Sequence, residues 1–564
     1  MEQVTVIGRG APGAKARGLA AVQELLATGV APFAAPAFTV TIPPLAVIAT
    51  GYFDRFMAEN ALARVVDASP PDDRIAAAFR RGALPADLLE ALAAPLATLR
   101  GPLAVRSSSV LEDGMAEPFA GVYTTRMLAS TARGPRNRLR ELSAAIQSVY
   151  ASTFFARARA CRRAAGRLDL DEKMAVIVQE VAGLRHNGRF YPHLSGVART
   201  WNFYPVGLAR PEDGVIALAL GLGRTIVEDG VCWPCSPAHP HANPPYITPK
   251  DLLDQTQKTF WAIDLASPPP ARARGAGGDS SRRYSLADAE ADGTLALVAS
   301  TYSPDDDRIV AGISRPGPRV VDFAPILRTQ RIPLVALLVN LLDRLGQALG
   351  APVEIEFAVS FGQPEPLPAQ FALLQVRPLR VAYPEVEVQV VDLPRSEVLA
   401  ASTKVLGNGV IDTIRDVVYT RPSTFELRHG QAVARTLEAI NRGLVEAGRP
   451  YVLIGFGRWG TSDPSAGIPA AFEQVSGARV IVETTSPRVN VLFSQGSHFF
   501  LNLTSHRILY FSVGHDEPHG IDWPWLDAQA AVSETAFVRH VRFARPLTIR
   551  ADGRTGRGVI AKPR

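Results

Sequence analysis

Two short segments beyond the middle of the chain carry residue types that suit magnesium and phosphate chemistry. A Val-Glu-Ile-Glu-Phe segment holds Glu354 and Glu356, and a Leu-Leu-Gln-Val-Arg segment holds Gln375 and Arg377. Because strand side chains alternate, each pair would share one face. If the two strands pair, two carboxylates, an amide oxygen and a guanidinium meet on one surface. Such a set suits Mg²⁺ with a polyphosphate, although an ordinary half-solvated sheet face has the same pattern.

Two further segments nearer the N-terminus could bind an anion. A glycine-bearing turn over residues 10–18 leads into an expected helix and places Lys15 near its start. Backbone N–H groups at a helix N-terminus attract anions, but the turn lacks the ending of a P-loop. Arg106 ends an expected strand, and a loop with Ser and Gly continues to residue 121. Each segment alone also fits a plain turn or a polar loop.

In order and type, these segments resemble the N-terminal ATP-binding domain of phosphoenolpyruvate synthase and pyruvate phosphate dikinase. Antibiotic and glucan dikinases share this domain, which has an ATP-grasp-type fold. The resemblance spans about residues 5–382 and rests on Gly13-Ala14-Lys15, Val105-Arg106-Ser107-Ser108, Phe119-Ala120-Gly121, Val178-Gln179-Glu180, Ser195-Gly196-Val197, Gly221-Leu222-Gly223, Ile355-Glu356-Phe357 and Leu374-Gln375-Val376-Arg377-Pro378.

The resemblance implies a role for each matching residue. Lys15 and Arg106 would bind the phosphates of ATP, and Arg377 would reach the transferring phosphoryl group. Glu356 and Gln375 would hold Mg²⁺. Phosphoryl transfer depends mainly on positioning and charge neutralisation, so this set is what the chemistry needs.

A second group of residues is implied to hold the nucleotide. The backbone of Gln179, Glu180 and Val181 would form the adenine hinge, and Glu354 stands where the family usually has Asp. The chain also departs from the family pattern at two positions: Ala14 replaces the second glycine of the turn, and Arg224 follows Gly-Leu-Gly where many members have Glu. These departures indicate a divergent branch.

The region after residue 400 has no close copy of the phosphohistidine motif of the parent enzymes. Its nearest match is a Gly-Ser-His sequence at an expected helix start, where His498 could carry a phosphoryl group or serve as a structural histidine. The glycine-rich segment 455–464 holds Arg458 and Asp463, and it suits either a loop for an acidic acceptor or a turn that caps a helix.

A Cys-x-x-Cys pair, Cys232 and Cys235, precedes His239 and His241. Zinc binding and a redox pair are both open, but a single pair of this kind predicts neither strongly, and ordinary loop or buried cysteines account for it best.

The helical and strand patterns along the chain predict an α/β (α+β) fold. The resemblance implies an ATP-grasp-type domain in two lobes, over residues 1–200 and 201–382, and we expect a linker over 383–399. A smaller C-terminal α/β domain would fill 400–564, either as a swivelling phosphohistidine-like domain or as an acceptor domain.

Composition supports a folded chain of several domains. The 564 residues are 47% hydrophobic with a net charge of +6, which excludes a wholly disordered protein. Basic blocks lack interleaved aromatic residues, so nucleic acid is not an expected partner. Neither a signal peptide nor a membrane span is expected, which predicts a cytoplasmic location. A homo-oligomer stays open.

The resemblance predicts an ATP-dependent phosphotransferase of the dikinase type, which converts ATP to AMP, phosphate and a phosphorylated small-molecule acceptor. The C-terminal region is too short for the ~250-residue barrel that binds phosphoenolpyruvate, so we expect an acceptor other than pyruvate. Two alternatives remain: an ATP-grasp ligase that forms an acyl phosphate and ADP, and a non-catalytic nucleotide-binding module.

Overall fold

A computed structural model gives the fold as a mixed α/β architecture with several sheets, as the sequence predicts. It describes residues 4–27, 37–109, 112, 122–131, 134–164, 172–202, 208–228, 231–242, 249, 252–253, 256–266, 278–328, 332–362, 367–379, 388, 394–461, 463, 465–491, 493, 508–518, 520–553 and 555–563. The chain divides into two units, of which the first comprises Met1–Thr200, Gly207–Ile226 and Val231–Leu379. The second comprises Trp201–Val206, Val227–Gly230 and Arg380–Arg564.

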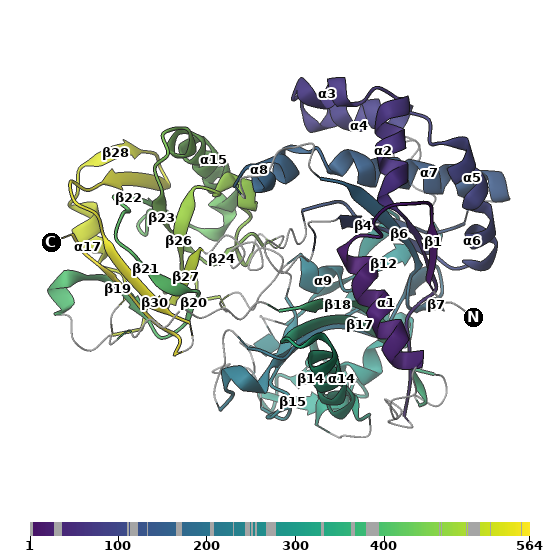
Figure 1. The fold of residues 1–564 in the computed structure, drawn as a ribbon. Coiled ribbons are helices and arrows are strands. Elements are labelled where there is room, and N and C mark those ends of the chain that lie inside the picture. Colours follow the sequence, from purple (N-terminus) through teal and green to yellow (C-terminus); the bar gives the residue numbers. More distant parts are fainter. Residues whose placement is uncertain are drawn as a thin grey trace. The chain divides into compact units, whose positions relative to one another are not determined.

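The first unit contains a five-stranded sheet covered by helices (Figure 1). Its order is β1 (Val4–Ile7), β3 (Leu45–Ile48), β6 (Met174–Glu180), β4 (Leu103–Ser109) and β5 (Arg126–Leu128), with β1 and β3 parallel and the other pairs antiparallel. Helices α2 (Thr50–Glu59) and α7 (Pro135–Ser152) pack on its central strands. Phe53 and Phe56 of α2 meet Tyr150 of α7, so aromatic rings fill the space between the two helices.

A six-stranded sheet forms the second layer of the first unit. Its order is β11 (Trp233–Cys235), β10 (Val215–Leu220), β9 (Leu194–Arg199), β17 (Val353–Ser360), β18 (Ala369–Pro378) and β2 (Phe38–Thr41). Strand β9 ends at Arg199, so this sheet draws on both segments that were expected as separate lobes. Helix α1 (Ala14–Ala27) packs on β18, and a Cβ atom on Gly18 would lie only 2.4 Å from the carbonyl oxygen of Val376.

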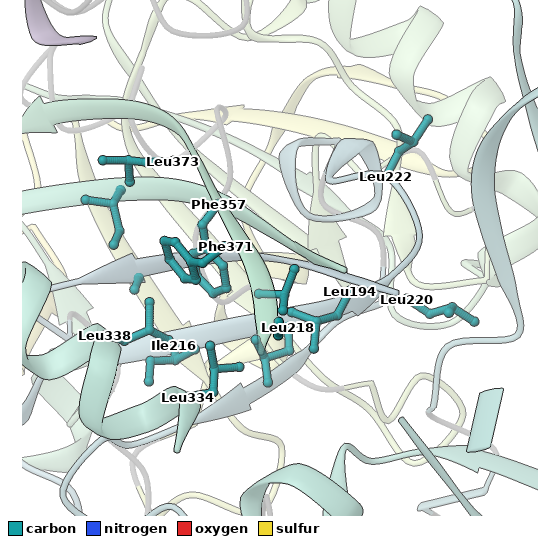
Figure 2. Packing of buried hydrophobic residues seen from close by; sticks show 14 of the residues in the cluster. Leu194, Ile216, Leu218, Leu220, Leu222, Leu334, Leu338, Phe357, Phe371 and Leu373 are labelled. Atoms are coloured by element: carbon teal, nitrogen blue, oxygen red, sulfur yellow. The ribbon is translucent and has the colours of Figure 1, made fainter. Parts of the chain in front are cut away.

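The core of the six-stranded sheet is closed by helix α14 (Leu334–Leu349). Leucines at helical spacing, among them Leu334 and Leu338, face Ile216 and Leu218 of β10 (Figure 2). Phe357 and Phe371 stack beside them with ring centroids 5.1 Å apart. This apolar layer fixes β17 and β18, whose other face carries the charged residues.

Smaller elements complete the first unit. They are the sheet β13 (Ser281–Ser285), β12 (Thr259–Asp264), β8 (Arg189–Tyr191) and β7 (Leu184–His186), the sheet β15 (Arg308–Ala311), β14 (Ala299–Ser303) and β16 (Arg319–Val321), and the helices α3 (Ala63–Asp67), α4 (Asp72–Arg81), α5 (Ala86–Ala91), α6 (Ala93–Thr98), α8 (Ala156–Ala164), α9 (Arg224–Val227), α12 (Leu286–Ala291) and α13 (Ala324–Leu327).

The second unit is built on a seven-stranded sheet. Its order is β20 (Val405–Leu406), β27 (Leu509–Val513), β26 (Ala478–Thr484), β23 (Tyr451–Phe456), β22 (Asp416–Thr420), β29 (Val538–Arg542) and β28 (Ala531–Glu534). Strands β22, β23, β26 and β27 are parallel, and helix α15 (Gly430–Glu446) connects the first two. Their carboxyl ends therefore meet at one edge of the sheet.

Other strands of the second unit cover one face of this sheet. A four-stranded antiparallel sheet, in the order β19 (Val398–Ser402), β31 (Arg557–Ala561), β30 (Thr548–Asp552) and β21 (Asn408–Ile411), shares its hydrophobic core. A short parallel pair, β24 (Arg458–Trp459) and β25 (Gly467–Ile468), and the helix α17 (Trp523–Asp527) complete the unit. Throughout the described ranges, no helix combines the length and apolar character needed to cross a membrane.

Candidate functional site

The two strands that carry the expected magnesium and phosphate residues pair in the structure. Strands β17 and β18 run antiparallel, and Glu356 faces Gln375 while Glu354 faces Arg377. These are direct cross-strand neighbours, whose Cβ atoms lie about 4.5–5.5 Å apart in antiparallel sheets. The four side chains therefore share one face of the six-stranded sheet.

Arg106 of β4 joins the five-stranded sheet to this face. Its guanidinium donates hydrogen bonds to Glu356 Oε2 at 3.1 Å, to Gln375 Oε1 at 2.8 Å and to the carbonyl oxygen of Leu374 at 3.0 Å. One carboxylate oxygen and one amide oxygen thus converge on a single cation. Hard oxygen donors in this arrangement fit Mg²⁺, which takes few protein ligands and keeps its remaining positions for water and phosphate.

Glu354 lies between two arginines on adjacent strands. Arg199 of β9 and Arg377 of β18 are its cross-strand neighbours, and each forms an ion pair with a different carboxylate oxygen of Glu354. Burial by itself would raise the pKa of Glu354, but the charges of Arg199 and Arg377 outweigh it and lower the pKa to about 2. Glu354 therefore stays ionised and orients Arg377.

Sequence reasoning did not assign a role to Arg199. The sequence does indicate the orientation of this arginine. Ser195, Val197 and Arg199 are spaced two residues apart along one strand, so Arg199 lies on the same face as Val197. Only the register of β9 against β17 brings that face to Glu354.

The glycine-bearing turn is locked to the end of β4. Gly13 has a φ of +82°, and a Cβ atom there would lie 1.6 Å from the carbonyl oxygen of Ser108. The hydroxyl of Ser108 accepts from the N–H of Ala16 at 3.2 Å and donates to the carbonyl oxygen of Pro12 at 3.0 Å. These contacts fix the first turn of α1, which carries Lys15.

Lys15 forms an ion pair with Glu112, a carboxylate to which the sequence analysis gives no role. Glu112 is only 1% exposed, and it also accepts from the Ser107 hydroxyl at 3.1 Å and from the Ser109 N–H at 3.3 Å. Lys15, Arg106 and Arg377 are therefore each held by a carboxylate: Glu112, Glu356 and Glu354.

The expected adenine hinge lies at the end of β6. The N–H of Glu180 donates to Pro44 at 3.0 Å, and the N–H of Val181 donates to Pro102 at 2.9 Å. The side chain of Glu180 accepts from the N–H of Gly101 at 2.9 Å, and the buried Gln179 side chain donates to Pro43 at 3.4 Å. An adenine base could accept a hydrogen bond from one of these two N–H groups only if the present hydrogen bond of that group broke.

Arg224, which departs from the family pattern, has contacts of its own. It donates to Asp279 and to Ser281 at 2.7 Å each, and its guanidinium lies 4.1 Å from the ring centroid of Trp261. A Cβ atom on Gly221 would lie 2.6 Å from the carbonyl oxygen of Trp261, so the Gly-Leu-Gly turn allows β12 to approach.

The remaining candidates from the sequence are His498, the Phe-Ala-Gly segment 119–121 and the Cys-x-x-Cys pair. His498 and the Phe-Ala-Gly segment 119–121 lie outside the described residues. Within the described part of the chain, no three His, Cys, Asp or Glu side chains form a metal-binding group. Cys235 is a buried free thiol in the hydrophobic core, and burial raises its pKa to about 12. Its position is that of a packing residue.

A family model matches this part of the chain. The pyruvate phosphate dikinase AMP/ATP-binding domain matches residues 11–397, which is more than half of the sequence. The chain belongs to this family and contains its ATP-grasp-like nucleotide-binding domain. The family and the fold class expected from the motifs are thereby confirmed. No curated protein matches the chain.

Proposed function

We propose that the chain is an ATP-dependent phosphotransferase of the dikinase type, which converts ATP to AMP, phosphate and a phosphorylated small-molecule acceptor. The observation that carries this proposal is the contact of Arg106 with both Glu356 and Gln375, in a chain of the dikinase nucleotide-binding family. A domain that only bound nucleotide would not need a phosphate-binding arginine fixed on an oxygen-donor pair.

Glu356 and Gln375 are the residues that would hold Mg²⁺. Their side-chain oxygens both accept from one cationic donor, which is a property of a site suited to a cation. When bound, Mg²⁺ would neutralise charge on the phosphates of ATP.

Three cations from three elements would position the phosphates. Lys15 lies on α1, Arg106 on β4 and Arg377 on β18. Phosphate oxygens would replace the carboxylate partners of Lys15 and Arg106, whose side chains are 12% and 15% exposed. Arg377 is more deeply buried and is oriented by Glu354, so we assign it the transferring phosphoryl group, for which fixed geometry matters most.

A phosphohistidine intermediate is one route for the dikinase reaction, and His498 is our candidate from the sequence. The alternative is an ATP-grasp ligase, which would use the same type of nucleotide-binding fold and would give ADP through an acyl phosphate. The acceptor is expected to differ from pyruvate.

Nucleotide product analysis tests the proposal. The purified chain is incubated with Mg²⁺ and ATP labelled at the β- or the γ-phosphate, and AMP, ADP, phosphate and protein-bound label are resolved. AMP with β-label on the protein supports the dikinase reaction, and loss of that label in His498→Ala would assign the carrier. ADP formation that depends on a carboxylate and an amine would overturn it in favour of the ligase.

A further inference from the structure

A buried polar cluster lies at the carboxyl edge of the parallel strands in the second unit. Glu483 of β26 and Ser512 of β27 are partners in the strand register and are both fully buried. The hydroxyl of Tyr510, two residues before Ser512 and so on the same face, donates to the carboxylate of Glu483. The opposite face of these strands packs into the hydrophobic core, so the polar groups are confined to one side.

The hydroxyl of Ser512 is buried and has no hydrogen-bond partner within the described structure. Buried polar groups in native proteins nearly always have a partner, and one without a partner calls for a specific explanation, such as a bound molecule. Apolar packing alone does not explain this site, because the neighbouring Glu483 is also fully buried. A buried carboxylate is stable only among polar groups.

The residues that follow β26 and β27 add further polar groups to this edge. The N–H of His515 donates to Thr485 Oγ1 at 3.0 Å, and the Nδ1 atom of His515 lies 2.9 Å from the same hydroxyl. His515 is exposed, Thr485 is 6% exposed and Ser512 is fully buried. The polar groups therefore extend from the surface to the buried Glu483–Ser512 pair.

Arg458 is a cationic residue whose backbone lies at the same edge. It follows β23 after Gly457, whose N–H donates to the carbonyl oxygen of Thr484 at 2.9 Å. Gly457 has a φ of +73°, and a Cβ atom there would lie 2.7 Å from the carbonyl oxygen of Ala466, so the turn requires glycine. Arg458 itself is only 7% exposed.

We propose that this edge, formed by Arg458, Glu483, Thr485, Ser512 and His515, binds a small molecule that carries both a hydroxyl group and an anionic carboxylate or phosphate. Glu483 and the Ser512 hydroxyl suit the hydroxyl of the ligand, and Arg458 suits its anionic group. The carboxyl ends of parallel strands are where α/β sheets commonly bind ligands. We identify this ligand with the phosphoryl acceptor, and that identification rests on the proposed function. The binding site itself does not depend on the proposed function.

Calorimetric titration of the full chain without ATP tests the site. The probes are glycerate, glycerol 3-phosphate and, as a molecule without an anionic group, glycerol. We expect one of the two anionic probes to bind more tightly than glycerol, and its identity distinguishes carboxylate from phosphate. Ser512→Ala should weaken that binding about tenfold, as loss of one hydrogen bond does, while Ser533→Ala on the exposed strand β28 should not change it.

The site is overturned if neither anionic probe binds the wild type more tightly than glycerol, or if Ser512→Ala binds as well as Ser533→Ala while both variants are folded. Glu356→Ala separates this result from the proposed function, because it should abolish ATP turnover and leave probe binding intact. If probe binding depends on Ser512 but no AMP forms, the proposed function is overturned and the site is supported. If AMP forms but neither anionic probe binds, the site is overturned and the proposed function is supported.

Discussion

In the six-stranded sheet of the first unit, the buried Glu354 lies between two arginines, whereas in the seven-stranded sheet of the second unit the buried Ser512 hydroxyl has no partner within the described residues. Both sheets bury polar side chains next to an apolar core. In the first, each carboxylate oxygen of Glu354 is paired with an arginine of the protein, and this pairing orients Arg377. In the second, no described residue pairs with the Ser512 hydroxyl, and we interpret this group as one that a bound ligand would pair with.

Glu354→Ala should produce the largest loss of stability. It leaves Arg199 and Arg377 buried without their shared carboxylate, and breaking a buried ion pair costs about 3–5 kcal/mol. Denaturant unfolding measures this difference, with the exposed Glu90→Ala as the control. A loss as small as that of the control would show that the arginines find other partners, and the contrast between the sheets would then disappear.

Glu356→Ala should abolish most ATP turnover while the protein stays folded. Glu356 is partly exposed, so its loss costs little stability, but removal of a group that positions charge in the transition state costs about 10²–10³-fold in rate. Steady-state turnover of ATP, with thermal unfolding of the same sample, measures both quantities. Full activity in this variant would contradict the assignment of Glu356 to magnesium.

Lowering the pH should reduce the stability of the first unit, because Glu354 becomes protonated. Its pKa in the folded state is about 2, below its ordinary value of 4.5, so the ionised carboxylate stabilises the fold above the ordinary value. That contribution is lost as the pH falls from about 4.5 towards about 2. Free energies of unfolding measured across this range should fall more steeply for the wild type than for Glu354→Gln. Parallel curves would show that Glu354 is not held by the arginines.

Ser512→Ala should have the smallest effect on stability in the absence of a ligand. The hydroxyl makes no hydrogen bond with the described residues, so its removal should change the free energy of unfolding by less than about 1 kcal/mol or raise it slightly. Denaturant unfolding of Ser512→Ala beside Ser533→Ala measures this change. A loss of about 2 kcal/mol or more would mean that the hydroxyl has a structural partner, and the second sheet would then resemble the first.

The motifs of the first unit were readable from the sequence because each one is local. Alternation along two strands put Glu354 with Glu356 and Gln375 with Arg377. The pairing of the two strands was only a condition in the sequence analysis, and the structure shows it. The mixed α/β fold and the family followed from the same motifs, and both are confirmed. The helix that begins at Ala14 likewise follows from the glycine-bearing turn.

The sequence alone could not show which cation meets which carboxylate. The Lys15–Glu112 and Arg106–Glu356 contacts join residues 97 and 250 positions apart. In the second unit, Glu483 and Ser512 lie on different strands, and nothing in their local sequences predicts that they are neighbours. Composition, alternation and turns are set by residues close in the chain, so the sequence determined the strands and the chemistry they carry. Register and packing depend on contacts between distant strands, so the Arg199–Glu354–Arg377 row, and the absence of a described partner for the Ser512 hydroxyl, follow from the three-dimensional fold.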